Sequence, residues 1–123
     1  MTPVNPWFLY AEDDKAALEQ LKNSDLYRPI CFHAQQLAEK LLKGLIFKTK
    51  QKIPRTHDLS VLVPLSRAQL SVTKQDLEFL SGLYVETRYP PDLGLLPTGE
   101  PDAEDAERAK AIALALYKDI MGK

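Results

Sequence analysis

Hydrophobic residues recur every three or four positions over most of this chain, which is the spacing of one face of an α-helix. The pattern predicts five helices, arranged mostly antiparallel because the connections between them are short. Their expected ranges are residues 6–21, 29–50, 58–68, 74–88 and 101–121. No stretch shows the two-residue alternation of a strand bounded by hairpin turns. The sequence therefore predicts an all-α fold, an up-and-down bundle of four to five helices.

Polar residues and prolines mark the ends of the expected helices. Asn5 before Pro6 is typical of a helix start, since the amide can cap the first turn and proline needs no N–H partner there. Thr56 or His57 is expected to cap the third helix. Pro64 inside that helix predicts a short or kinked element, because proline removes a backbone donor.

The last two helices also have recognisable starts. Thr73 and Asp76 have the spacing of a capping box, in which each residue bonds the backbone of the other. The motif RYPP stops the fourth helix, and a proline-rich loop is expected after it. Acidic residues in the first turn of the fifth helix suit the positive end of the helix dipole.

The composition fits one folded domain, residues 1–123. Hydrophobic residues make up 45% of the 123 positions, which is enough for one core. The formal net charge of -1 argues against a dedicated nucleic-acid coat, so any recognition of a polyanion must be local. The middle of the chain is basic and the start of the last helix is acidic. The basic residues are Lys40, Lys43, Lys48, Lys50, Lys52 and Arg55, and the acidic ones are Glu100, Asp102, Glu104, Asp105 and Glu107.

Cysteine content and hydropathy indicate the compartment. The single cysteine, Cys31, excludes an internal disulfide and indicates a reducing environment. No apolar run approaches the ~18 residues of a membrane span, and the N-terminus lacks the order of a signal peptide. A cytoplasmic protein is therefore expected.

The second helix carries two different faces. One is broadly apolar and is expected to face the core. The other is a stripe in which two aromatic residues flank an amide and two charges: Phe32, Gln36, Glu39, Lys43 and Phe47. One interpretation is intrachain packing, with Glu39 and Lys43 forming an i,i+4 pair. The other is an association surface, on which aromatic anchors supply burial and the opposed charges fix the register.

Two charged residues fall inside apolar helical patterns. Asp14 lies in the apolar stripe of the first helix, and Arg88 lies in that of the fourth. A lone buried charge is costly, so each should find a partner or reach water. We hypothesise that Asp14 and Arg88, or one of them with Lys40 or His57, form a polar cluster. Such a cluster would be a ligand-binding pocket for an anion or nucleotide, or a salt bridge that fixes helix register.

Three segments in order carry a resemblance to a known family. They are FHAQQLAEKLLKGLI in the second helix, IPRTHDLSVL after it, and YVETRYPPD at the end of the fourth helix, before an alanine-rich last helix. Together they resemble the HEPN domain family, named for nucleotide binding in higher eukaryotes and prokaryotes. The resemblance extends over nearly the whole chain, from Trp7 to Met121.

The resemblance implies a bundle of four or five helices that forms a homodimer. It also implies a minimal nucleotidyltransferase partner, in a two-component system of toxin–antitoxin type, and contact with a nucleotide or RNA. Some members of the family are metal-independent ribonucleases. Their motif is an arginine followed by a polar residue, with a histidine after four to six intervening residues.

The sequence departs from that ribonuclease motif. Arg88 has no histidine at the required spacing, and the residue after it is Tyr89. Arg28 and His33 have the spacing, but Pro29 replaces the polar residue and the pair lies at the start of the second helix. The expected function is therefore a HEPN subunit with no catalytic residue. A divergent ribonuclease and a non-catalytic helical adaptor remain the alternatives.

Other chemistry finds little support. His33 and His57 are the only histidines, and neither has a metal-ligand partner at a helical spacing. No phosphate-binding loop or nucleophile motif is present. No metal and no cofactor are expected.

Overall fold

The computed structural model describes residues 4–88 and 100–122, and in the last turn of the fourth helix, residues 85–88, it describes the backbone alone. Within this part the chain forms helices and no strands, so the all-α prediction is confirmed. The helices are α1 (Pro6–Leu21), α2 (Tyr27–Lys48), α3 (Leu59–Ser66), α4 (Lys74–Arg88) and α5 (Ala103–Met121). None of the described helices is long and apolar enough to cross a membrane.

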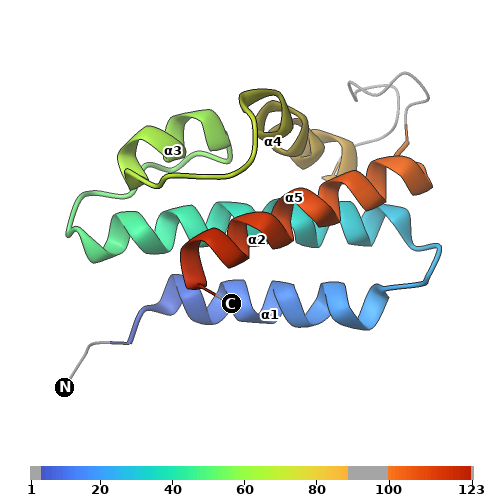
Figure 1. Cartoon of the computed structure of the whole chain (residues 1–123), viewed down its shortest axis with the longest axis horizontal. Helices are drawn as coiled ribbons and strands as arrows, with labels where there is room; N and C mark the ends of the chain where they lie inside the picture. The colour runs from blue at the N-terminus through green and yellow to red at the C-terminus, as the bar shows by residue number, and fades with distance from the viewer. Residues whose placement is uncertain (1–3, 89–99, 123) are drawn as a thin grey trace.

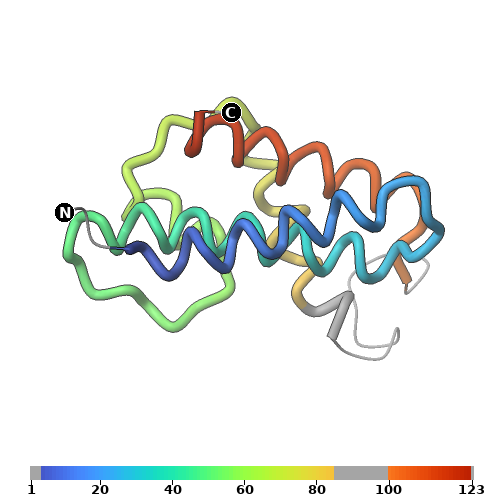
Figure 2. The backbone as a smooth tube through the Cα atoms, turned by 90° about the horizontal axis from the view of Figure 1, so that it is seen from below, coloured from blue at the N-terminus to red at the C-terminus, as the bar shows by residue number. Residues whose placement is uncertain are grey.

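Helix α2 is the centre of the bundle. Figure 1 shows α1 along one side of it, α5 crossing in front, and α3 with α4 on the opposite side from α1. Figure 2 shows α1 lying along α2 again, with the α2–α3 connection on one flank and α5 on the other. The two helices α1 and α2 are antiparallel, whereas α4 crosses α2 steeply. All four other helices pack against α2, which is why 13 of its 22 residues are buried.

The core is made of leucine, isoleucine and alanine side chains from all five helices. Leu37, Leu41 and Leu42 of α2 are fully buried, and Leu80 and Leu116 reach them from α4 and α5. Burying one such side chain stabilises the fold by about 1.5–3 kcal/mol. The core therefore fixes where α2 lies, and with it every polar side chain that α2 carries.

The start of α1 packs closely on the end of α2. Asn5 caps α1 by accepting hydrogen bonds from the backbone N–H groups of Trp7 and Phe8. Its amide nitrogen also donates to the carbonyl oxygen of Gly44, at 3.0 Å. A Cβ atom on Gly44 would lie 2.2 Å from Cε1 of Phe8, so only glycine permits this approach. The predicted cap is confirmed, and it also joins two helices.

The start of α3 differs from the expectation. The capping residue is Asp58, whose Oδ1 accepts from the N–H of Ser60 at 3.0 Å, so the assignment of the cap to Thr56 or His57 was wrong. Oγ1 of Thr56 instead accepts from the N–H of Asp58, and the His57 ring turns toward α2. The helix has eight residues with Pro64 inside it, so the short element predicted from that proline is confirmed.

The capping box at the start of α4 is also confirmed. Oγ1 of Thr73 accepts from the N–H of Asp76 at 3.0 Å, and Oδ2 of Asp76 accepts from the N–H of Thr73 at 3.3 Å. These hydrogen bonds, together with Arg108 of α5, lower the pKa of Asp76. A second capping box, between Asp102 and Asp105, starts α5.

Candidate functional site

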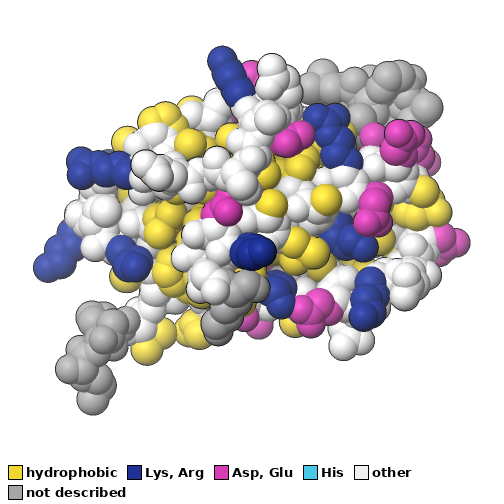
Figure 3. Space-filling model, viewed as in Figure 1, with side chains coloured by type: hydrophobic (Ala, Val, Ile, Leu, Met, Phe, Trp, Pro, Cys, Tyr) yellow, Lys and Arg dark blue, Asp and Glu magenta, His cyan; other side chains and the backbone are white. Residues whose placement is uncertain are grey.

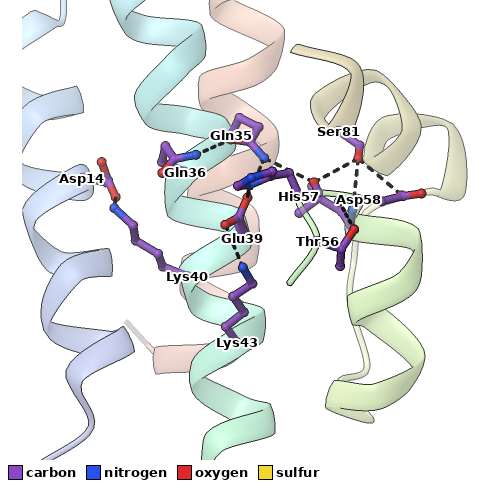
Figure 4. A network of polar contacts seen from close by, with 11 residues as sticks. Asp14, Gln35, Gln36, Glu39, Lys40, Lys43, Thr56, His57, Asp58 and Ser81 are labelled. Carbon is purple, nitrogen blue, oxygen red and sulfur yellow. Dashed lines mark hydrogen bonds and ion pairs between the residues drawn. The ribbon is translucent and has the colours of Figure 1, made fainter. Parts of the chain in front are cut away.

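A row of polar side chains lies along α2, between α1 and the α2–α3 connection (Figure 4). Four of them are less than a tenth exposed, although they are amides or charged groups: Gln35, Gln36, Glu39 and Lys43. We call the following set the polar seam: Asp14, His33, Gln35, Gln36, Glu39, Lys40, Lys43 and His57. It is the candidate functional site, because buried polar groups need specific partners and constrain the structure around them.

Glu39 is the centre of one half of the seam. Its Oε2 accepts from Nζ of Lys43 at 3.0 Å, and its Oε1 accepts from Nε2 of Gln35 at 3.2 Å. The Nδ1 atom of His57 lies 2.8 Å from the same Oε1. A carboxylate taken out of water loses several kcal/mol of solvation, and these three contacts offset that loss. Each residue of this half therefore depends on Glu39.

The two glutamines extend the network from Glu39 in two directions. Nε2 of Gln36 donates to Oε1 of Gln35 at 2.7 Å. Nε2 of Gln35 also approaches the backbone oxygen of His57 at 3.4 Å. Gln35 holds the backbone of His57 and Glu39 holds its ring, so α2 attaches the α2–α3 connection at both the backbone and the side chain of one residue.

His57 is the exposed end of this half, with 45% of its side chain accessible. Its ring stacks on the ring of Tyr84 from α4, with the centroids 3.8 Å apart and the planes at 13°. Because a carboxylate only accepts, the Nδ1 atom that faces Glu39 carries a proton. The outer Nε2 atom is then the one through which His57 could contact a ligand.

Asp14 is the centre of the other half of the seam. Its Oδ2 accepts from Nζ of Lys40 at 2.7 Å, and its Oδ1 lies 2.8 Å from Nδ1 of His33. Asp14 is 5% exposed, so the pair with Lys40 supplies the partner that the sequence required of a buried charge. Lys40 also lies near the ring of Tyr10, 5.9 Å from its centroid.

The fixed charges of the seam balance. Two carboxylates, Asp14 and Glu39, face two ammonium groups, Lys40 and Lys43. Each of these two cations therefore already has a counter-charge within the chain. The seam can order helices and present the edge of His57, but its lysines offer an anion little uncompensated charge.

The structure places the predicted site residues in different surroundings. It joins Asp14 with Lys40, whereas His57 contacts Glu39 instead of Asp14. Arg88 ends α4, and its side chain lies outside the described residues. A role in binding a ligand stays a prediction for all four.

The predicted association stripe of α2 is divided between interior and surface. Gln36, Glu39 and Lys43 are buried within this chain, and Glu39 and Lys43 form the i,i+4 pair of the first interpretation. Phe47 is 39% exposed, and the half-buried ring of Phe32 meets His33 edge to face at 5.0 Å. Association through this stripe stays a prediction, and its exposed end at Phe47 is what a partner would reach.

Sequence reasoning missed two members of the seam. His33 lies seven positions before Lys40, two helical turns away, so both point toward Asp14. Gln35 lies one turn before Glu39, where an amide can bond a carboxylate. Both could have been found from the sequence by their helical spacing from a charged residue of α2, Lys40 for His33 and Glu39 for Gln35.

Arg28 and His33, which have the spacing of the ribonuclease motif, do not form one site. Nη2 of Arg28 contacts Oε1 of Glu100 at 2.8 Å, whereas His33 is held by Asp14. Cys31 lies between them in the sequence, and burial raises the pKa of its thiol to about 12, so it is a poor nucleophile at neutral pH. Among the described residues, no group of three or more His, Cys, Asp or Glu side chains could hold a metal ion.

Comparison with known proteins identifies relatives of the chain. The family model of the HEPN domain matches residues 4–122. The crystal structure of TT1696 from Thermus thermophilus is similar with a TM-score of 0.73, covering 97% of this chain and 98% of that one. The two sequences are 24% identical, so this similarity shows the fold alone. No curated protein matches the sequence significantly.

Proposed function

Because the chain belongs to the HEPN domain family, we propose that it is a cytoplasmic, dimeric HEPN subunit without nuclease activity. It acts with a minimal nucleotidyltransferase in a two-component system of toxin–antitoxin type. It contacts a nucleotide or RNA through the exposed edge of the polar seam. The family membership supports the class of function, and the structure of the seam supports the details below.

The separation of Arg28 from His33 carries the non-nuclease part of the proposal. A metal-independent ribonuclease needs an acid–base pair close to one phosphate, with reacting groups about 3 Å from their targets. Arg28 and His33 instead have different carboxylate partners on different elements, Glu100 and Asp14. The sequence offers no histidine after Arg88 to replace this pair.

The association part rests on exposed apolar side chains beside the seam. Leu9 and Tyr10 of α1 are 56% and 54% exposed, and Phe47 of α2 is 39% exposed. Tyr10 lies near Lys40 of the seam, and the ring of Trp7 lies near Lys43, with Nζ 5.4 Å from its centroid. Exposed aromatic side chains are frequent anchors of protein interfaces. We infer that a second copy meets this face, with Phe47 at its edge.

The ligand part rests on the outer atoms of the seam. Lys40 is 23% exposed at its side chain and His57 is 45% exposed, while their carboxylate partners are buried. Asp14 and Glu39 thus position two side chains whose outer atoms face solvent. A nucleotide or RNA end would be contacted through hydrogen bonds to these atoms and through Arg88, with Asp14 as the positioning carboxylate. Hydrogen bonding and not net charge would hold it there, because the charges of the seam balance.

Co-expression with the product of the neighbouring reading frame tests the partner. We expect that frame to encode a small nucleotidyltransferase, and we expect the two proteins to copurify as one complex. The double variant Phe32→Ala/Phe47→Ala should lower recovery of the partner if the same face is used. The variant Leu26→Ala/Val61→Ala is the matched control, since both side chains are exposed and apolar, Leu26 at the N-cap of α2 and Val61 on α3.

Two outcomes would contradict the proposed function. A neighbouring frame of unrelated type, with no copurifying nucleotidyltransferase, would leave a plain helical adaptor. Cleavage of RNA by the purified protein, abolished by both Arg28→Ala and His33→Ala, would restore the ribonuclease.

A further inference from the structure

One end of the molecule carries a group of cations that the seam does not include. We call it the basic pole, and its members are Lys48, Lys50, Lys52, Arg55 and Arg67. All five are exposed. They come from the end of α2, the α2–α3 connection and the end of α3, and Figure 3 shows dark blue side chains at that end of the molecule. No acidic residue occurs between Glu39 and Asp58 in the sequence.

The cations of the basic pole have no partner in the part of the chain that the structure describes. None of the five side chains takes part in a salt bridge or hydrogen bond with any described residue, in contrast with the lysines of the seam. Like charges gathered without counter-charges repel one another and attract a polyanion. The basic pole therefore has the uncompensated charge that the seam lacks.

The acidic end of a second copy is a poor complement to the basic pole. Four of its five carboxylates are already used within the chain. Glu100 contacts Arg28, Asp102 and Asp105 form a capping box, and Glu107 contacts Lys110, which leaves Glu104. Head-to-tail stacking of two copies would therefore supply one available acid to five cations.

Helix dipoles explain why two of the five cations occur where they do. Lys48 lies in the last turn of α2, and Arg67 is the left-handed C-cap of α3, so both face the negative end of a helix. This effect contributes about 0.3–1 kcal/mol at each position. It does not extend to Lys52 and Arg55, which lie in the connection beyond the end of α2.

Lys52 and Arg55 line a hollow between the α2–α3 connection and the end of α3. The cavity has a volume of about 510 Å³, and its other walls are the apolar side chains of Ile53, Pro54 and Leu65. Nε2 of Gln51 donates to the backbone oxygen of Leu65 at 3.3 Å, which holds the connection against the end of α3. The hollow thus combines two cations with an apolar floor.

We propose that the basic pole binds the phosphodiester backbone of single-stranded RNA. Unpaired cations contact successive phosphates and release their counterions, while the apolar floor of the hollow accommodates unstacked bases. A duplex keeps its bases stacked and cannot use that floor. The proposal rests on the proposed function for RNA as the ligand, and it names a surface separate from the seam.

Fluorescence anisotropy with a labelled oligouridylate of about twelve nucleotides tests the proposal. We expect binding at about 50 mM salt that weakens steeply by about 200 mM, because several phosphates are neutralised. Lys52→Glu/Arg55→Glu should weaken binding at least about tenfold and reduce the salt dependence. Lys22→Glu/Lys118→Glu makes the same charge change at two exposed lysines, the C-cap of α1 and the last turn of α5, and should bind within about twofold of wild type.

Three results would overturn the proposal, and they separate it from the proposed function. Equal loss in both charge-reversal variants would show that net charge alone decides binding. Loss only in Lys40→Ala/His57→Ala would place the RNA at the seam, so the proposed function would stand without the basic pole. Binding of polyglutamate with no binding of RNA would assign the pole to an acidic protein and remove RNA from both proposals. The nucleotidyltransferase partner would still be tested by copurification, and the dimer by its molar mass.

Discussion

The polar seam and the basic pole both carry lysines on α2 or next to it, but their surroundings are opposite. In the seam, Lys40 and Lys43 each face a buried carboxylate within the chain. At the pole, Lys52 and Arg55 are exposed and have no acidic partner among the described residues. The role of a charged residue in this helical protein therefore depends on whether it has a partner. Buried charges that are paired stabilise the fold, whereas exposed charges without a partner are available to a ligand.

Removing the centre of the seam should have the largest effect. Glu39→Ala leaves Lys43 buried without its counter-charge and also removes the acceptor for Gln35 and His57. We expect the free energy of unfolding to fall by about 3–5 kcal/mol, as measured by urea denaturation. Glu39→Gln keeps the shape and should cost less. A loss below about 1 kcal/mol for the alanine variant would show that the seam does not hold the bundle together.

The reactivity of Cys31 should report the same difference between the two regions. The thiol is fully buried in α2, and burial raises its pKa to about 12, so labelling by a disulfide reagent at neutral pH requires the helix to open. Glu39→Ala should speed labelling about a hundredfold or more if opening follows stability. Lys52→Ala/Arg55→Ala should leave the rate unchanged. Equal acceleration in both variants would contradict the division between seam and pole.

A double-mutant cycle on Asp14 and Lys40 should show a smaller coupling. The two side chains form an ion pair at 2.7 Å with one buried partner, so their combined loss should differ from the sum of the single losses. We expect an interaction of about 0.5–3 kcal/mol in the free energy of unfolding. Asp14 with Lys52, two residues that form no ion pair with each other, is the control and should be additive. Additive effects for Asp14 and Lys40 would exclude the pair.

Neutralising the pole should have the smallest effect on stability. Lys52→Ala/Arg55→Ala removes two exposed cations that no described residue pairs with, so thermal or urea unfolding should shift by no more than about 0.5 kcal/mol. The change should be slightly favourable at low salt, where repulsion among the remaining cations is strongest. A large destabilisation would mean that these side chains support the fold and are not reserved for a ligand.

Most of the fold could be predicted from the sequence because its signals are local. Helical periodicity and the Asn5 and Thr73 caps located the helices to within a few residues. The family predicted from three short segments is confirmed by the match over residues 4–122. The third helix was placed one residue too early because three polar residues in a row, from Thr56 to Asp58, could each have capped it.

The seam could be predicted only in part, because its contacts join distant segments. The helical projection placed Gln36, Glu39 and Lys43 opposite the core face and so suggested a surface. They are buried because α1 and the α2–α3 connection cover that side of α2 as well. A single sequence shows which residues share a face, but it does not show what packs on it. The partner of Asp14 was narrowed to a few candidates by the cost of a buried charge, and Lys40 was among them.

The molar mass in solution tests whether association takes place through the face beside the seam while the basic pole is left to a ligand. Light scattering on the purified chain at tens of micromolar should give about twice the 13.9 kDa of one chain. Lys52→Glu/Arg55→Glu should keep that mass, and Phe32→Ala/Phe47→Ala should approach the mass of one chain while keeping its helical circular dichroism. A wild-type monomer at this concentration, or a folded Phe32→Ala/Phe47→Ala variant with the mass of a dimer, would contradict the account.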